Sequence, residues 1–141
     1  MGVMLQMMTT FTLSTRGKGL YEFTQEAARW IAAGTITSGL LTLFCRHTSA
    51  SLLINENAAP AVKRDLLRWF DRAVPEGGGY EHDDEGPDDM PAHIRAMLTG
   101  ASLSVPVEGS RMMLGTWQGL YLAEHRAAPH NRQVAAHLIG E

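Results

Sequence analysis

Three histidines stand among residues that could do chemistry: His47, His82 and His93. His47 follows an apolar run and precedes Thr48 and Ser49, which places it at an expected strand end, where functional groups are common. Three neutral imidazoles can hold a Zn²⁺-type ion and leave one position open for water or substrate. Their spacings match no local metal signature. The pattern alone therefore leaves open a core-edge role for His47 and a solvated surface role for the segment around His82.

Other polar side chains could serve the same site. Glu56 lies between an expected strand and helix and is a candidate general base or metal partner, although a surface position beside the helix cap Asn57 is an equally simple interpretation. Arg126, which follows Glu124 and His125, and Arg132 have the forked geometry that suits phosphate, and the alternative is a charged strand end. Arg46 and Arg132 could also supply positive charge to a leaving group. Gln118 lies in a turn bracketed by glycines, where a ligand could approach the backbone or a bulge could simply form.

The composition excludes several classes of protein. The chain has 141 residues, of which 45% are hydrophobic and 19% charged, and this fits one globular domain over residues 1–141 rather than a disordered chain. A formal net charge of −3 offers no basic field for nucleic acid or anionic lipid, so we expect neither as a partner. The sequence contains no phosphate loop, no dinucleotide fingerprint and no nucleophile elbow.

The sequence predicts a cytoplasmic protein. Its single cysteine, Cys45, cannot form an internal disulfide, and the apolar run around it favours a buried small hydrophobe over a reactive thiol. The apolar start at residues 1–8 is too short for a signal peptide and lacks its basic residues. No apolar run approaches the ~20 residues of a membrane helix, so we expect no membrane association.

The N-terminal half is expected to mix strands and helices. We predict a strand at residues 7–14, a helix at 20–33, a strand at 39–47 and an extended segment at 51–55. A second helix, capped by Asn57 and stopped by Pro75, should bury a stripe that includes Trp69 and Phe70.

The C-terminal half is expected to be mostly strands. An acidic loop at residues 76–89 leads into a short helix that ends at Gly100. Strands at 102–107, 112–117, 120–125 and 132–139 suggest an antiparallel meander. Because strands and helices do not alternate strictly, we expect an α+β fold.

Three ordered blocks of the sequence resemble the YjbQ-like (UPF0047) family. The first block is His47-Thr48-Ser49-Ala50-Ser51-Leu52 with Asn55-Glu56-Asn57. The second is Tyr80-Glu81-His82-Asp83 with Asp88-Asp89-Met90-Pro91-Ala92-His93-Ile94. The third is Gly115-Thr116-Trp117-Gln118-Gly119 with Glu124-His125-Arg126. The resemblance extends from about residue 10 to the C-terminus. One departure is that many relatives carry an acidic residue-glycine-proline turn after the Glu124 position, which this chain lacks.

The resemblance implies a fold, an assembly and a site. The fold is a mixed or antiparallel sheet in a sandwich or barrel-like core flanked by helices, and the assembly is a homotrimer with the site near subunit boundaries. The implied ligands of a divalent ion, Zn²⁺ or Mg²⁺, are His47, His82 and His93. Glu56 and His47 are the catalytic candidates. The residues expected to bind substrate are Thr48, Ser49, Gln118 and Arg132.

The resemblance also implies a secondary thiamine-phosphate synthase activity, which joins hydroxymethylpyrimidine pyrophosphate to thiazole phosphate and releases pyrophosphate. Such a transferase would take a phosphorylated small molecule and need positive charge on its leaving group. A metal-dependent hydrolase and a non-catalytic trimer that binds a metal or small ligand are the alternatives. Three histidines favour Zn²⁺ whereas pyrophosphate chemistry favours Mg²⁺, and the sequence does not decide between them.

Overall fold

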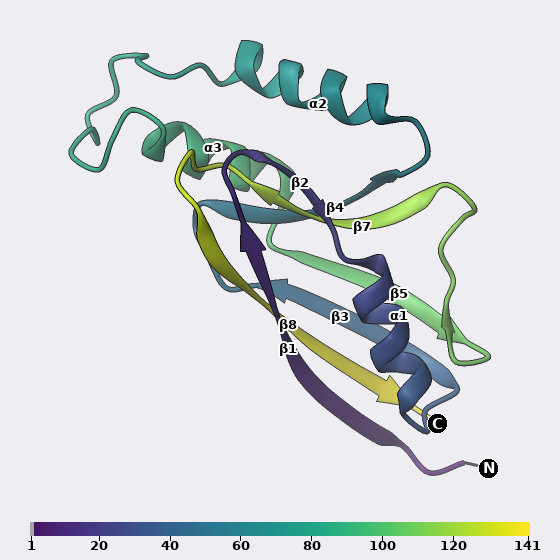
Figure 1. Ribbon diagram of the computed structural model, residues 1–141. Helices are drawn as coiled ribbons and strands as arrows, with labels where there is room; N and C mark the ends of the chain where they lie inside the picture. The colour runs from purple at the N-terminus through teal and green to yellow at the C-terminus, as the bar shows by residue number, and fades with distance from the viewer. Residues whose placement is uncertain (1) are drawn as a thin grey trace.

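Two antiparallel sheets and three helices make up the computed structural model, which describes residues 2–141 (Figure 1). The five-stranded sheet has the order β1-β8-β3-β5-β6 and the three-stranded sheet the order β2-β7-β4. The strands are β1 (Leu5–Thr15), β2 (Gly19–Glu22), β3 (Ser38–Cys45), β4 (Ala50–Glu56), β5 (Ser102–Glu108), β6 (Arg111–Met112), β7 (Gln118–Glu124) and β8 (His130–Gly140). The helices are α1 (Thr24–Ala33), α2 (Pro60–Ala73) and α3 (Asp89–Thr99).

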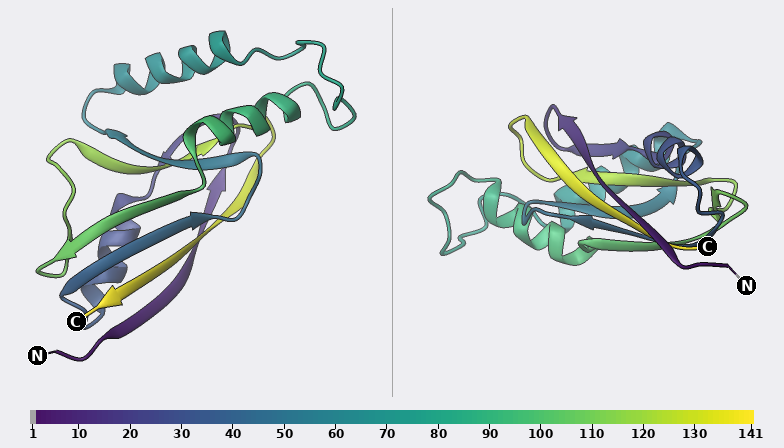
Figure 2. Two further views of the ribbon diagram at one scale, coloured as in Figure 1. Left: turned by 180° about the vertical axis from the view of Figure 1, so that it is seen from behind. Right: turned by 90° about the horizontal axis from the view of Figure 1, so that it is seen from below.

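The core lies inside the curl of the two sheets, which together form a half-barrel (Figure 2). Alternate residues of β8 are buried, as the two-residue period of a half-buried strand requires. The amphipathic helix α1 inserts Ala27 and Ile31 into the same core. On the other side of the small sheet, α2 and α3 lie beside β4 and β7 (Figure 1), and Leu66 and Leu67 of α2 pack against a second cluster around Tyr121.

The α+β class and the antiparallel pairing predicted from the sequence are confirmed. The predicted meander is wrong, because β7 pairs with β2 and β4 whereas β8 pairs with β1 and β3. The chain crosses from one sheet to the other between these two strands, and local spacing carries no information about such distant partners. Burial of Cys45 in the core is also confirmed.

Several element boundaries differ from the prediction. The strand expected at residues 112–117 is reduced to β6, Arg111–Met112. The helix expected from residue 20 begins at Thr24, because residues 19–22 form β2 on the edge of β7. Asn57 does not cap α2; its Nδ2 donates to Glu22 Oε2 at 3.0 Å, and Ala59 occupies the N-cap position. Tertiary contacts therefore override the local signals at residues 19–22 and at Asn57. Within residues 2–141, no helix is long and apolar enough to span a membrane.

Candidate metal centre

The start of α3 presents two potential metal ligands on one face. Asp89 and His93 are four residues apart, so they lie one above the other on the helix. His93 Nε2 lies 3.1 Å from Asp89 Oδ2, and the Asp89 carboxylate is almost fully buried. A buried carboxylate must be paired, because an isolated charge is expensive to remove from water.

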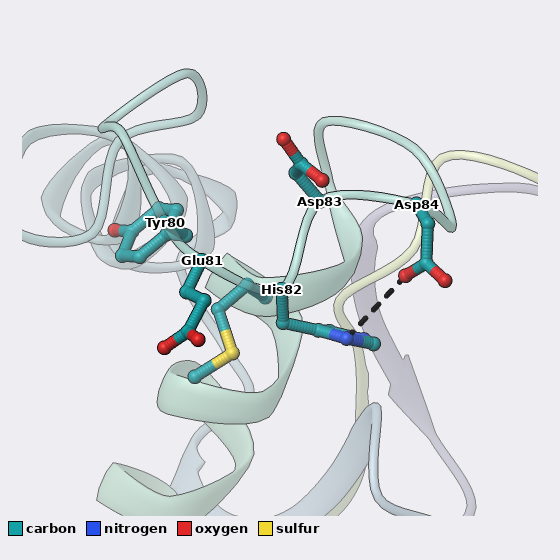
Figure 3. Close-up of a pocket in the computed structure, with 6 residues that line it drawn as sticks. Tyr80, Glu81, His82, Asp83 and Asp84 are labelled. Atoms are coloured by element: carbon teal, nitrogen blue, oxygen red, sulfur yellow. Dashed lines mark ion pairs between the residues drawn. The ribbon is translucent and has the colours of Figure 1, made fainter.

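The acidic loop before α3 contributes the third ligand. His82 Nε2 lies 2.8 Å from the same Asp89 Oδ2, and 3.1 Å from Glu85 Oε2. Asp84 faces the other ring nitrogen of His82 at 3.5 Å (Figure 3). The ligating atoms of His82, Asp89 and His93 all lie within 4.8 Å of one another, which is close enough to share one ion. The loop beside them forms a cavity of about 650 Å³, lined by Tyr80, Glu81, His82, Asp83, Asp84 and Met90.

The hydrogen bonds of His93 show which of its nitrogens is available. Nδ1 lies 2.9 Å from the carbonyl oxygen of Thr48, which can only accept a hydrogen bond, so Nδ1 carries the proton. In the neutral ring, Nε2 then presents a lone pair toward the Asp89 carboxylate, which also accepts. Either a second proton or a cation must lie between them. A backbone carbonyl on one nitrogen is the usual way in which proteins orient a metal-ligating histidine.

The charges in this cluster shift one another's protonation. The hydrogen bond to Asp89 raises the pKa of His82, against the smaller effect of burial. Burial alone would raise the pKa of Asp89, but the hydrogen bond to His82 and the charges of His93 and Arg126 outweigh it and lower that pKa. Asp89 is therefore an ionised carboxylate at neutral pH, as a metal ligand must be.

His47 lies outside this cluster, in the turn after β3. Its Nε2 accepts the backbone N–H of Gln133 at 2.7 Å. Burial, followed by the charge of Arg132, lowers the pKa of His47 and keeps its ring neutral. The neighbouring Thr48 contributes only the carbonyl that orients His93. The role of His47 as a metal ligand stays a prediction, and Asp89 takes the third place in the group that the geometry assembles.

The predicted substrate-binding residues Arg132 and Ser49 are occupied by internal contacts. Arg132 donates to both carboxylate oxygens of Glu124, at 2.8 Å and 2.5 Å, and to Ser49 Oγ at 2.9 Å. Thr15 Oγ1 donates to Glu124 as well, at 2.6 Å. The network is buried, so the Arg132 guanidinium does not face solvent.

Glu56 and Gln118 pair across β4 and β7, at the end of the small sheet far from Glu124. Gln118 and Glu124 are six positions apart along β7, which is about 20 Å at ~3.4 Å per residue. Glu56 Oε2 accepts the backbone N–H of Ala59, and Gln118 Oε1 accepts that of Gly115. The structure therefore does not bring these two residues to the histidine cluster.

Glu124, the last residue of β7, and the two residues after it each belong to a different set of contacts. Glu124 pairs with Arg132, and Arg126 contacts Asp88 and Asp89. Between them, the buried His125 lies 2.8 Å from Ser51 Oγ and edge-on to Phe70, and burial lowers its pKa to about 4. His125 is thus a buried residue with a neutral ring at neutral pH.

Sequence reasoning missed Asp89 and Arg126 as parts of the site. Asp89 was expected only as part of the second family block, although the spacing Asp89-x-x-x-His93 on a helix places both side chains on one face. Arg126 was a candidate only for binding phosphate, and no local pattern pointed to its contacts with Asp88 and Asp89, which lie almost forty residues earlier in the chain.

Comparisons with known proteins agree with the fold and with the family blocks. The family model described as "UPF0047 protein YjbQ-like" matches residues 9–141. The chain is 48% identical to a UPF0047 protein of Synechocystis sp. over 92% of this chain and 88% of the relative. It is 47% identical to the UPF0047 protein YjbQ of Escherichia coli O157:H7 over 94% of this chain and 96% of the relative.

Solved structures of similar proteins have the same fold as this chain. A yjbq/upf0047 family protein of Clostridium acetobutylicum has a TM-score of 0.81 at 33% identity, covering 94% of this chain and 98% of that one. A YbjQ-like protein of unknown function from Sulfolobus solfataricus has a TM-score of 0.91 at 22% identity, covering 99% of this chain and 100% of that one, and this likeness concerns the fold alone. On the match over residues 9–141, the chain belongs to the YjbQ-like (UPF0047) family.

Proposed function

We propose that this protein is a metal-dependent hydrolase in which His82, Asp89 and His93 hold a Zn²⁺-type ion. The observation that carries the proposal is the convergence of two imidazole Nε2 atoms on one carboxylate oxygen, at 2.8 Å and 3.1 Å. With His93 Nδ1 already donating to Thr48, a cation between these atoms satisfies all three ligands at once.

The spacing of the ligands suits a small tetrahedral ion. Nitrogen and oxygen ligands 2.0–2.1 Å from such an ion lie roughly 3.3 Å from one another. The observed separations are shorter by a few tenths of an ångström, which a small outward movement of the exposed His82 ring would supply. Imidazole nitrogens favour zinc over Mg²⁺, which prefers oxygen. Two histidines and a carboxylate also leave a fourth position open, as catalytic zinc sites do.

A bound ion of this kind would lower the pKa of a water molecule toward neutrality and supply a nucleophile. The protein's own contribution is to orient the ligands and to take up the proton. Thr48 fixes the His93 ring through its carbonyl oxygen. Glu85 Oε2, 3.1 Å from His82 Nε2, lies where a carboxylate could accept a proton from the water.

The charges near the cavity bear on the substrate. Glu81, Asp83 and Asp84 line it, and they would repel a pyrophosphate group. Arg126 and Arg132 are both paired with carboxylates. A neutral or cationic substrate therefore suits this cavity better than a phosphorylated one. The thiamine-phosphate synthase activity is the alternative candidate, and for it the ion would have to supply the missing positive charge.

Assembly as a homotrimer stays a prediction, with one feature in its favour. The outer face of the five-stranded sheet exposes Leu40 and its cross-strand partner Ile139, together with Phe44 on the same strand. Contiguous exposed apolar side chains commonly mark protein interfaces. Light scattering should then report a particle three times the 15.4 kDa mass of one chain.

The decisive experiment measures ion content and turnover on one set of variants. Purified protein should bind one Zn²⁺ per chain, and His93→Ala should lose it. His47→Ala should keep the ion, whereas the ligand set implied by the family resemblance predicts its loss. Turnover is assayed with p-nitrophenyl acetate and, separately, with both thiamine precursors. Wild-type protein that binds no Zn²⁺ would refute the hydrolase proposal, and synthesis of thiamine phosphate that depends on a divalent ion, Zn²⁺ or Mg²⁺, would establish the alternative.

A further inference from the structure

We propose that Arg126 is a positioning residue for the metal centre, which holds the acidic loop against α3 so that His82 meets Asp89 and His93 before an ion binds. The inference rests on the proposed metal site and concerns how that site is kept assembled. Asp89 and His93 share one helix, so α3 fixes their relation. His82 comes from the loop, and something else must hold it.

The loop has little structure of its own. Gly77 and Gly79 adopt positive φ values of 70° and 73°, and a side chain at either position would meet open space. Glycines in such a segment leave the unfastened backbone many conformations, and fixing it costs entropy. A ligand on this loop would therefore bind an ion weakly unless a contact outside the loop restrained it.

Arg126 supplies that contact at three points. Its Nε donates to Asp88 Oδ2 at 3.0 Å, one terminal nitrogen donates to Asp89 Oδ1 at 2.8 Å, and the other donates to the Glu85 carbonyl oxygen at 3.0 Å. The planar fork of arginine allows these bonds to form together. Glu85 is three residues from His82, so the guanidinium ties the ligand-bearing part of the loop to the start of α3.

The same contacts select which Asp89 oxygen faces the histidines. Arg126 occupies Oδ1, which leaves Oδ2 for His82 and His93. Arg126 is itself fixed at its backbone, since its N–H donates to Glu124 Oε2 at 3.1 Å, and the next N–H, of Ala127, donates to Asp88 Oδ2 at 2.8 Å. The ion site is thus anchored to the end of β7.

The test compares Zn²⁺ affinity, measured by chelator competition, in wild-type protein, Arg126→Gln and Arg126→Lys. Loss of groups that orient metal ligands typically weakens affinity about 10–100-fold, and we expect this for Arg126→Gln. Lysine keeps the charge but not the fork, so Arg126→Lys should weaken binding to a smaller extent. Arg29→Gln, which removes an exposed arginine on α1, is the matched control and should bind as the wild type does.

A second readout separates positioning from general stability. Amide hydrogen exchange of residues 80–88 in metal-free protein should speed up in Arg126→Gln, while the exchange of β3 and β8 stays unchanged. If Arg126→Gln does not fold, Asp88→Asn weakens the same contact and should raise the Kd in the same direction. Wild-type protein that binds no Zn²⁺ refutes the metal centre and the positioning role with it. Zinc binding by the wild type with an unchanged Kd in Arg126→Gln refutes the positioning role alone.

Discussion

Arg132 and Glu124 form a buried ion pair in which the guanidinium reaches both carboxylate oxygens, at 2.8 Å and 2.5 Å. Glu124 ends β7 in the small sheet and Arg132 lies near the start of β8 in the large one. The pair therefore joins the two sheets at the point where the chain crosses between them. Arg126 links the pair to the candidate metal centre, because its backbone N–H donates to Glu124 Oε2 and its guanidinium donates to Asp88 and Asp89.

Removing Arg132 should destabilise the protein strongly. Arg132→Met leaves Glu124 charged and buried, and breaking a buried pair in this way costs about 3–5 kcal/mol of unfolding free energy. Adding Glu124→Gln should restore part of this loss, since a neutral amide is cheaper to bury than an unpaired carboxylate. Urea unfolding measures both. The exposed Arg46→Met is the control, at roughly 0.5 kcal/mol or less, and a double variant less stable than Arg132→Met would contradict the expectation.

Acid should weaken the fold through His125 before it affects the carboxylates. Burial, followed by the charge of Arg95, lowers the pKa of His125 to about 4, whereas the unfolded chain has ~6.5. The free energy of unfolding that the neutral His125 ring contributes is therefore fully present above pH ~6.5. It is lost as the pH falls toward 4, at about 1.4 kcal/mol per pH unit. Glu124, whose pKa is also lowered, acts in a lower window that begins near its unfolded pKa of ~4.3.

The loss of stability assigned to His125 is measured by urea unfolding of chelator-treated protein between pH 7.5 and pH 4.5. His125→Gln keeps a partner for Ser51 but cannot titrate, so its stability should fall less steeply with acid than that of the wild type. His137→Gln, on the outer face of β8, serves as the control for loss of a histidine. Parallel pH profiles for the wild type and His125→Gln would show that His125 is not the group responsible.

The sequence predicted burial correctly where the pattern lies within a single strand or helix. The apolar run around Cys45 predicted a buried strand, and the helix pattern predicted Phe70 in the interior; both residues are buried. Trp69 belongs to the same apolar stripe, yet it is 48% exposed. Amphipathicity tells which face of a helix is apolar, but it does not tell whether another element covers all of that face.

Only part of the candidate site could be predicted from the sequence, for a related reason. His82 and His93 stood out by residue type, and the helical spacing of Asp89 and His93 was present in the sequence. The place of His82 depends instead on a glycine-rich loop, in which the Glu85 carbonyl oxygen accepts a hydrogen bond from Arg126, a residue that follows β7. Contacts of this kind arise from the tertiary fold, so no local pattern separates His82 from His47 as a ligand.

A close approach of backbones makes Gly39 irreplaceable in β3. Gly39 pairs with Gly140 of β8, and a Cβ atom at Gly39 would lie 2.2 Å from the Ile139 carbonyl oxygen. Backbone cannot move aside as a side chain can, so Gly39→Ala should cost about 1–3 kcal/mol or more in urea unfolding. Gly34→Ala is the matched control, because its Cβ would come close, at 2.6 Å and 2.8 Å, to the flexible end of Met7, while the Ile31 carbonyl oxygen lies at an ordinary 3.6 Å. Equal losses in the two variants would contradict this account.

A Glu85→Gln variant should show whether Glu85 binds the ion or accepts a proton in the proposed hydrolase. Its Oε2 lies 3.1 Å from His82 Nε2, close enough for either role. Glu85→Gln keeps the shape of the side chain but cannot accept a proton, and loss of a general base lowers kcat about 10²–10⁴-fold. Zinc content should stay at one ion per chain, with Glu26→Gln on α1 as the unaffected control. If the ion is lost together with activity toward p-nitrophenyl acetate, Glu85 is a fourth ligand, and the open position required for a nucleophilic water would then be filled by the protein itself.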